Sequence, residues 1–116
     1  MSRASEIRCM SHDRFLRMLV FFDLPTETKQ DRREYARFRK FLIKNGFLMM
    51  QESVYCKLLL HATAQQLLLA QLHKNKPPTG LVQILTVTER QFVRIEYLVG
   101  EYHGDAVISD ERLLEF

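Results

Sequence analysis

The segment LRMLVFFDLP, at residues 16–25, constrains the fold more than any other part of the chain. Its apolar run, 18–22, ends at a carboxylate, Asp23, which is followed by a turn containing Pro25. A short apolar run with Val and Phe, ended by turn residues, is typical of a strand buried on both faces. We therefore expect a central strand over 16–23, with Asp23 at the point where the chain leaves the core.

A helix is predicted after this turn. Thr28 is a candidate N-cap, and Asp31 falls in the first turn, where negative charge complements the helix dipole. Gly46 suits a left-handed C-terminal cap, so the periodicity predicts a helix over 29–45. The apolar set expected to face the core is Tyr35, Phe38, Phe41 and Leu42.

The middle of the chain predicts further strands and a second helix. Residues 47–60 have an extended pattern with a bend at 52–53, so one bent strand or two consecutive strands both fit. The sequence TAQQ at 63–66 matches a capping box and predicts a helix that ends near Asn75, ahead of two prolines. The residues expected to form its buried stripe are Ala64, Leu67, Leu68 and Leu72.

Residues 81–88, LVQILTVT, are strongly β-forming, and 89–91 are expected to turn the chain. A half-buried strand is then predicted, because apolar residues alternate with polar ones at Val93, Ile95, Tyr97 and Val99. A further short strand is expected over 106–108.

This order of elements predicts an α+β fold of the ferredoxin-like βαββαβ type, with an antiparallel sheet and an extra C-terminal strand. Both helices would cover one face of the sheet and leave the other face open and apolar. An isologous homodimer is the simplest way to cover such a face, so we expect the protein to be homodimeric.

The 116 residues fit one domain, which we place at 15–116 with an acidic tail, after a flexible polar leader at 1–14. The two cysteines form no disulfide pattern and indicate free thiols in a reducing compartment. No apolar run reaches the roughly 18 residues of a membrane span. The N-terminus does not resemble a signal peptide. We therefore expect a cytoplasmic protein with no membrane partner.

Asp23 is the leading candidate for a metal-binding or catalytic residue. Taken alone, a carboxylate before a Leu-Pro turn is most often a turn or cap residue. In a dimer, two copies of Asp23 could meet across the two-fold axis and hold Mg²⁺ in the largely hydrated shell that this ion prefers. Such an ion could activate water and neutralise a phosphodiester. The residues themselves leave both roles open.

Positive charge is concentrated on the first predicted helix. Residues 29–44 contain seven basic and two acidic residues, a local charge of +5, whereas the whole chain carries +3. This pattern fits either an ordinary solvated helix face or a surface that binds a polyanion, and a phosphate backbone suits it better than base edges. The candidate nucleic-acid-binding residues are Lys29, Arg32, Arg33, Arg37 and Lys40. The histidines show no metal-ligand spacing and are interpreted as surface or cap residues.

Four stretches together resemble a known family. They are LRMLVFFDLPT at 16–26, FRKFLIKNGFLMMQESVYCKLLL at 38–60, ILTVTERQF at 84–92 and ISDERLL at 108–114. This ordered set, above all QESVY at 51–55 and TVTER at 86–90, is similar to the second CRISPR-associated protein, the small adaptation subunit, in its type II form. The resemblance covers nearly the whole predicted domain.

That resemblance implies a ferredoxin-like homodimer whose last strand pairs with the partner subunit. It implies a role in spacer acquisition, in which the dimer bridges two dimers of the CRISPR-associated integrase and holds the double-stranded protospacer DNA. It also implies a metal-dependent endonuclease that cleaves single-stranded RNA or double-stranded DNA. Asp23 of each protomer would then be the catalytic residue and the Mg²⁺ ligand.

Two positions depart from the family pattern. Phe22 stands where members with nuclease character often carry tyrosine, which removes a hydroxyl group next to Asp23. The loop GEYHGD at 100–105 lacks the basic pair that some members carry, so backbone binding would rest more on the first helix. The alternative from a different class is a non-catalytic, dimeric ferredoxin-like interaction module without a nucleic-acid role.

Overall fold

The structure of the chain is a computed structural model that describes residues 15–101. The elements follow in the order β1 (Leu16–Asp23), α2 (Lys29–Lys44), β2 (Leu48–Gln51), β3 (Val54–Leu59), α3 (Ala62–Lys74), β4 (Leu81–Thr88) and α4 (Glu89–Phe92). The leader at 1–14, the strand expected over 106–108 and the acidic tail beyond Glu101 lie outside the described residues. Within them, the predicted βαββαβ order is confirmed.

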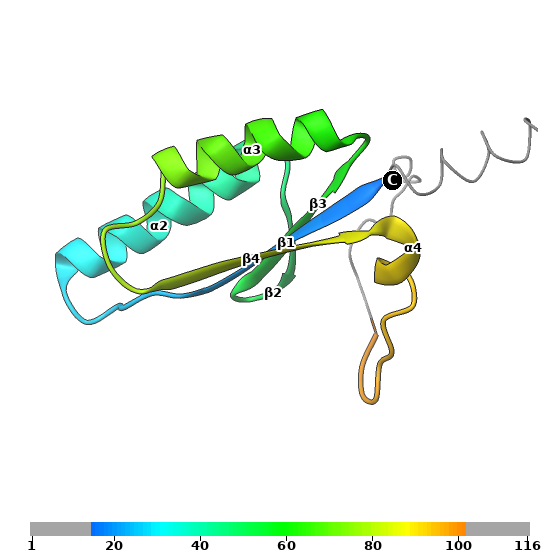
Figure 1. Cartoon of the computed structure of the whole chain (residues 1–116). Coiled ribbons are helices and arrows are strands. Elements are labelled where there is room, and N and C mark those ends of the chain that lie inside the picture. The colour runs from blue at the N-terminus through cyan, green and yellow to red at the C-terminus, as the bar shows by residue number, and fades with distance from the viewer. Residues whose placement is uncertain (1–14, 102–116) are drawn as a thin grey trace, which may run out of the picture.

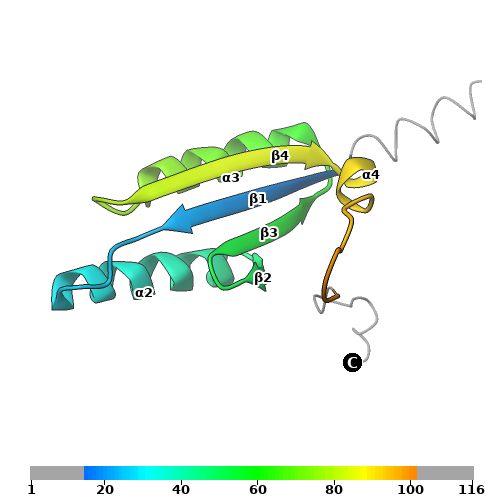
Figure 2. The same cartoon turned by 90° about the horizontal axis from the view of Figure 1, so that it is seen from below.

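The four strands form one antiparallel sheet in the order β2-β3-β1-β4. β1 is an inner strand: it pairs with β4 over its whole length and with β3 over residues 16–21. α2 and α3 lie side by side on one face of this sheet (Figure 1). Seen from below, the strands lie in front of both helices (Figure 2), so the predicted helix-covered face and open face are confirmed.

The main hydrophobic core lies between the sheet and the two helices. Its buried members include Met18, Val20, Phe22, Phe38, Leu42, Tyr55, Leu68 and Leu72. A second, smaller cluster lies on the open face, where Leu19 of β1 packs with Cys56 of β3 and Phe92 of α4. Because side chains alternate along a strand, β1 contributes to both clusters.

Strong local signals explain why β1, α2 and β4 match their predicted ranges to within one residue. Thr28 is the N-cap of α2: its hydroxyl accepts a hydrogen bond from the backbone N–H of Asp31 at 2.9 Å, and the Asp31 carboxylate accepts one from the Thr28 N–H. At the other end Asn45 is the C-cap, and Gly46 follows with a φ of +91°. The segment 47–60 resolves into two strands separated by a turn at 52–53.

The start of α3 differs from the prediction. The helix begins at Ala62, and His61 is its N-cap, whose Nδ1 accepts a hydrogen bond from the backbone N–H of Ala64 at 3.2 Å. Thr63 therefore lies inside the first turn. The capping box predicted at 63–66 is wrong because the imidazole two residues earlier already satisfies the first turn.

One member of the stripe predicted for α3 is also wrong. Leu68 and Leu72, four residues apart, are buried as expected, but Leu67 is 66% exposed. Leu69 packs against the core instead. Neighbouring residues differ by about 100° around a helix axis, so when Leu68 and Leu72 face the core, the side chain at position 67 points toward solvent.

The half-buried strand predicted over 93–99 is not formed. The expected turn at 89–91 is the start of α4, which Thr88 caps by accepting a hydrogen bond from the backbone N–H of Gln91 at 3.1 Å. The alternating apolar residues that follow are exposed: Val93 (65%), Ile95 (45%), Tyr97 (44%) and Val99 (92%). The predicted strand at 93–99 is therefore wrong for a single chain, which pairs this segment with none of its described strands.

Candidate active site and basic helix

Asp23 is the last residue of β1, and its side chain is exposed. Alternation places it on the open face with Leu19 and Phe21, opposite to the face covered by α2 and α3. No residue within 15–101 makes a hydrogen bond or an ion pair with its carboxylate. The capping role is excluded, because Thr28 caps α2.

Gly80 allows the chain to pass close to the backbone of Asp23. It has a φ of +96°, and a Cβ atom at this position would lie 3.0 Å from the Asp23 carbonyl oxygen and 2.7 Å from Leu24 Cδ2. The next residue, Leu81, is the register partner of Asp23 in the sheet. Glycine at position 80 therefore lets β4 begin beside the end of β1, which holds Asp23 in place.

A shallow depression of about 180 Å³ lies at this end of the sheet. It is lined by Phe21, Phe22, Asp23, Ser53, Val54, Leu81 and Gln83. Three polar side chains thus come together from three segments: Asp23 from β1, Ser53 from the β2–β3 turn and Gln83 from β4. Ser53 and Gln83 were not among the site residues predicted from the sequence. Gln83 could have been found as the one polar residue among the outward positions of β4, which otherwise carry Leu and Val.

These residues fit a hydrated Mg²⁺ ion. Within residues 15–101, no three His, Cys, Asp or Glu side chains group together, so one copy supplies a single carboxylate. Mg²⁺ in proteins is commonly bound through one or two carboxylates and keeps several waters. An exposed carboxylate that is unpaired within residues 15–101 and has two neutral polar neighbours suits this mode of binding.

Phe22 is among the residues that line the depression, but its ring points away from the Asp23 carboxylate. Its ring is buried in the main core, stacked on Tyr55 at 5.6 Å between centroids and edge-on to Phe38 at 5.5 Å and Tyr35 at 5.9 Å. The ring therefore packs on the opposite face of the sheet from the Asp23 carboxylate. Phenylalanine instead of tyrosine at position 22 therefore affects the packing of the aromatic core more than it affects the open face.

Two of the five predicted nucleic-acid-binding residues hold the backbone of their own chain. The guanidinium of Arg32 donates to the carbonyl oxygens of Thr26 and Glu27, both at 3.0 Å. The guanidinium of Arg37 donates to the carbonyls of Asn75 and Lys76, at 3.2 and 3.4 Å, and to the carboxylate of Glu34 at 2.8 Å. Arg32 thus fixes the loop before α2, and Arg37 ties α2 to the end of α3.

The other three predicted nucleic-acid-binding residues, Lys29, Arg33 and Lys40, are less constrained. Arg33 donates to the side-chain oxygen of Gln30 at 3.1 Å, one turn earlier. Lys29 and Lys40 are exposed and make no hydrogen bond or ion pair within the described part of the chain. Because α2 covers the face opposite to Asp23, the basic helix and this carboxylate lie on different sides of the sheet in one copy (Figures 1 and 2).

A buried charge lies at the other end of β1, which the sequence analysis also missed. Arg17 is 7% exposed, and its guanidinium makes two hydrogen bonds to the Glu89 carboxylate at 2.8 and 2.6 Å. It also donates to Cys56 Sγ at 3.7 Å and lies 4.4 Å from the centre of the Phe92 ring. Burial by itself would lower the pKa of Arg17, but the hydrogen bonds and charge of Glu89 outweigh it, so the pKa is raised. The sequence signal was Arg17 itself, because a single arginine within an otherwise apolar strand indicates a buried ion pair.

Known proteins resemble this chain over most of its length. CRISPR-associated endoribonuclease Cas2 of Treponema denticola is 48% identical over 99 residues, which cover 85% of this chain and 98% of that relative. The protein of the same name from Streptococcus mutans serotype c is also 48% identical over 99 residues, 85% of this chain and 91% of that relative. The Acidovorax ebreus protein is 49% identical over 85 residues, 73% of this chain and 83% of the relative.

A solved structure described as the crystal structure of cas2 has a TM-score of 0.53 to this chain at 21% identity, covering 78% of this chain and 92% of the other, which shows a shared fold. No helix of the described residues is long and apolar enough to cross a membrane. The family model for CRISPR associated protein Cas2 matches residues 16–95. On this match and the identities to its relatives, the chain belongs to the Cas2 family.

Proposed function

We propose that this protein is a homodimeric subunit of CRISPR spacer acquisition that also hydrolyses phosphodiester bonds with Mg²⁺ held by Asp23. The single observation that carries the catalytic part is the position of Asp23, which is exposed and unpaired within residues 15–101 on the open apolar face of the sheet. The relatives are named endoribonucleases, which agrees with cleavage of RNA.

The open face supports both the dimer and the metal. It carries large exposed apolar side chains on several strands, among them Leu48, Leu58, Leu81 and Leu85. Covering them with a second copy would also remove water from Asp23, and an ionised carboxylate is costly to bury without a partner. A cation between two such carboxylates would supply that partner.

The residues around Asp23 have separable roles in this proposal. Mg²⁺, when bound, would activate a water molecule and neutralise charge on the phosphodiester. Asp23 would bind the ion. The hydroxyl of Ser53 and the amide of Gln83 line the same depression and can hydrogen-bond to waters of the ion or to phosphate oxygens.

The binding part of the proposal rests on α2. Its exposed cations Lys29, Arg33 and Lys40 would hold the phosphate backbone of a protospacer duplex, with Arg32 and Arg37 adding charge while they fix the backbone. The acidic C-terminal segment would dock to the CRISPR-associated integrase, so that one dimer bridges two integrase dimers. Opposite charge on the two surfaces would favour this association.

The experiment compares wild type with Asp23→Asn on single-stranded RNA and on double-stranded DNA, each with Mg²⁺ and with EDTA. Wild type should cleave only with Mg²⁺, and Asp23→Asn should not cleave while it stays dimeric by light scattering. The matched control is Glu27→Gln, which neutralises an exposed carboxylate in the following loop and should cleave like wild type. Equal cleavage by Asp23→Asn would overturn the catalytic assignment. Absence of both cleavage and nucleic-acid binding in wild type would identify a non-catalytic interaction module.

A further inference from the structure

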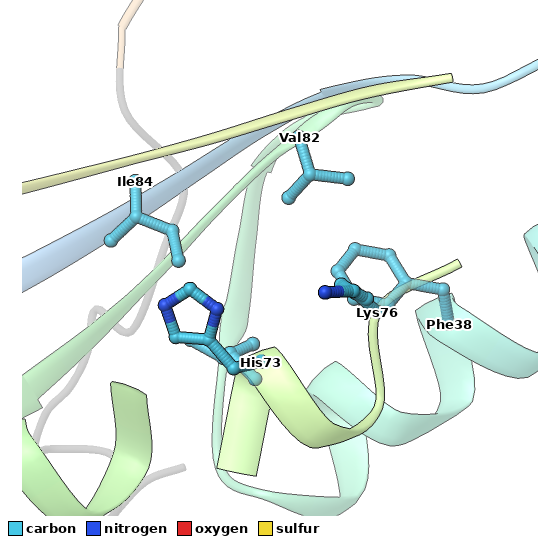
Figure 3. Close-up of a pocket in the computed structure, with 6 residues that line it drawn as sticks. Phe38, His73, Lys76, Val82 and Ile84 are labelled. Atoms are coloured by element: carbon cyan, nitrogen blue, oxygen red, sulfur yellow. The ribbon is translucent and has the colours of Figure 1, made fainter. Parts of the chain in front are cut away.

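A second depression lies on the helix side of the molecule, between the two helices and the edge strand β4. It is lined by Phe38 of α2, Leu72 and His73 of α3, Lys76 of the following loop, and Val82 and Ile84 of β4. Its volume is about 130 Å³. Figure 3 shows Val82 and Ile84 on one side of the space, and His73, Lys76 and Phe38 on the other.

The rim of this pocket carries a positively charged side chain, Lys76, beside the imidazole of His73. His73 and Lys76 are exposed, and neither side chain makes a hydrogen bond or an ion pair with residues 15–101. None of the residues that line the pocket is acidic. The Arg37 guanidinium lies beside the rim, because it donates to the carbonyls of Asn75 and Lys76. That contact also holds the loop carrying Lys76 in place.

The size and lining of the pocket restrict the ligand. Small-molecule pockets usually measure roughly 300–1,000 Å³, so a space of about 130 Å³ admits one ring system and leaves the rest of the ligand outside. The walls are apolar: Val82 and Ile84 are partly exposed, whereas Phe38 and Leu72 are buried and close the bottom of the pocket, and Lys76 and His73 stand at the opening. The best match is a flat ring carrying an anionic group, because the ring can enter between β4 and the helices while the anion stays at the rim.

We propose that this pocket binds the base of an unpaired nucleotide, with His73 and Lys76 holding its phosphate. Bases pack on apolar and aromatic side chains with little sequence preference, and lysine binds phosphate as a point charge. The basic surface of α2 continues from Arg37 and offers a path for the adjoining phosphates. The site lies on the opposite face of the sheet from Asp23, and it does not depend on the proposed cleavage.

Two sources supply this chemistry: a free mononucleotide, or an unpaired nucleotide within or at the end of a strand. The first arm of the test titrates uridine 5′-monophosphate into the full-length protein and follows backbone amide resonances by NMR. The second arm measures the anisotropy of a fluorescein-labelled single strand of ten nucleotides. Saturable shifts at Val82 and Ile84 in the first arm identify the free nucleotide as a ligand. Binding in the second arm alone, dependent on Lys76, identifies the strand.

The decisive variant is Lys76→Glu, and its matched control is Lys74→Glu. Lys74 is exposed at the end of α3 and does not line the pocket, so both variants make the same change in net charge. Lys76→Glu should weaken binding about tenfold, as expected for loss of a charge-assisted contact, and Lys74→Glu by less than about twofold. Lys76→Arg should restore most of the affinity. Equal losses in the two glutamate variants, with no shifts at Val82 and Ile84, would overturn the proposal.

Discussion

The two ends of β1 carry opposite charges in opposite surroundings. Arg17, near the start, is buried and is neutralised within the chain by Glu89. Asp23, at the end, is exposed and has no partner in the described part of the molecule. Both belong to the face that α2 and α3 leave open, and the difference arises because α4, which carries Glu89 and Phe92, covers only the Arg17 end. A charge with internal partners holds the fold together, whereas a charge without them is available to a ligand.

The largest expected effect is on stability at the Arg17 end. Glu89→Gln leaves the Arg17 guanidinium buried without its counter-charge, and loss of one partner of a buried pair is strongly destabilising. We expect the free energy of unfolding to fall by about 3 kcal/mol, measured by urea denaturation. Asp23→Asn should not lower it in the absence of Mg²⁺, because the substitution removes a carboxylate that has no partner within residues 15–101. Equal effects of the two substitutions would remove the contrast between the ends.

The pH dependence of this loss provides a check of its cause. Because the folded pKa of Arg17 is raised, the stability that its charged form contributes is fully present below the ordinary arginine pKa and is lost only as the pH rises through the higher folded value. The difference between wild type and Glu89→Gln should therefore be constant from about pH 7 to 10. A difference that vanished within this window would point to another titrating group.

An effect of intermediate size is expected at the Asp23 end when Mg²⁺ is added. An ion that binds only the folded protein stabilises it, by about 1.4 kcal/mol at ten times the dissociation constant. Wild type should gain this amount in thermal unfolding, and Asp23→Asn should gain none. The control is Glu27→Gln, which should respond like wild type. A gain in Asp23→Asn equal to that of wild type would place the ion elsewhere.

A smaller effect should separate the tied and untied cations of α2. The double substitution Lys29→Gln and Lys40→Gln removes two exposed charges that have no hydrogen-bond or ion-pair partner within residues 15–101. The slope of log affinity against log salt for duplex binding should therefore become shallower by about 0.9 for each phosphate that is no longer neutralised. Stability should stay near that of wild type. Arg37→Gln should instead lower stability as well, because it breaks the link to the end of α3. Fluorescence anisotropy across a salt series and urea unfolding measure the two quantities.

The sequence predicts the elements well where the signals are local. The apolar run of β1 and the N-cap at Thr28 each lie within a few neighbouring residues. β1 has its predicted bounds, and α2 begins where predicted and ends one residue earlier. The start of α3 was missed because His61, an uncommon N-cap, takes the role that Thr63 was expected to fill. The strand at 93–99 was misplaced because alternation indicates a half-buried strand but does not identify which chain supplies the neighbouring strand.

The candidate site was predictable only in part for a similar reason. Asp23 could be singled out because its position after an apolar run is visible in the sequence. Ser53 and Gln83 join it only through the register of three strands, which sequence periodicity does not specify. Arg37 donates hydrogen bonds to the carbonyls of Asn75 and Lys76, which lie far from it in the sequence, and these contacts depend on how α2 and α3 pack. Arg37, predicted as a nucleic-acid-binding residue, therefore also stabilises the fold.

The exposed apolar segment at 93–99 would make complete folding of this protein depend on its concentration. Its alternating side chains are exposed among the described residues. In the proposed homodimer a second copy would bury them, so the last step of structure formation would be second order. For such a subunit, dilution acts like a mild denaturant and expression level acts like a stabilising ligand. In a cell that makes little of this protein, the apolar segment at 93–99 would stay exposed. The protein concentration, rather than a change in the sequence, would then determine whether the subunits assemble.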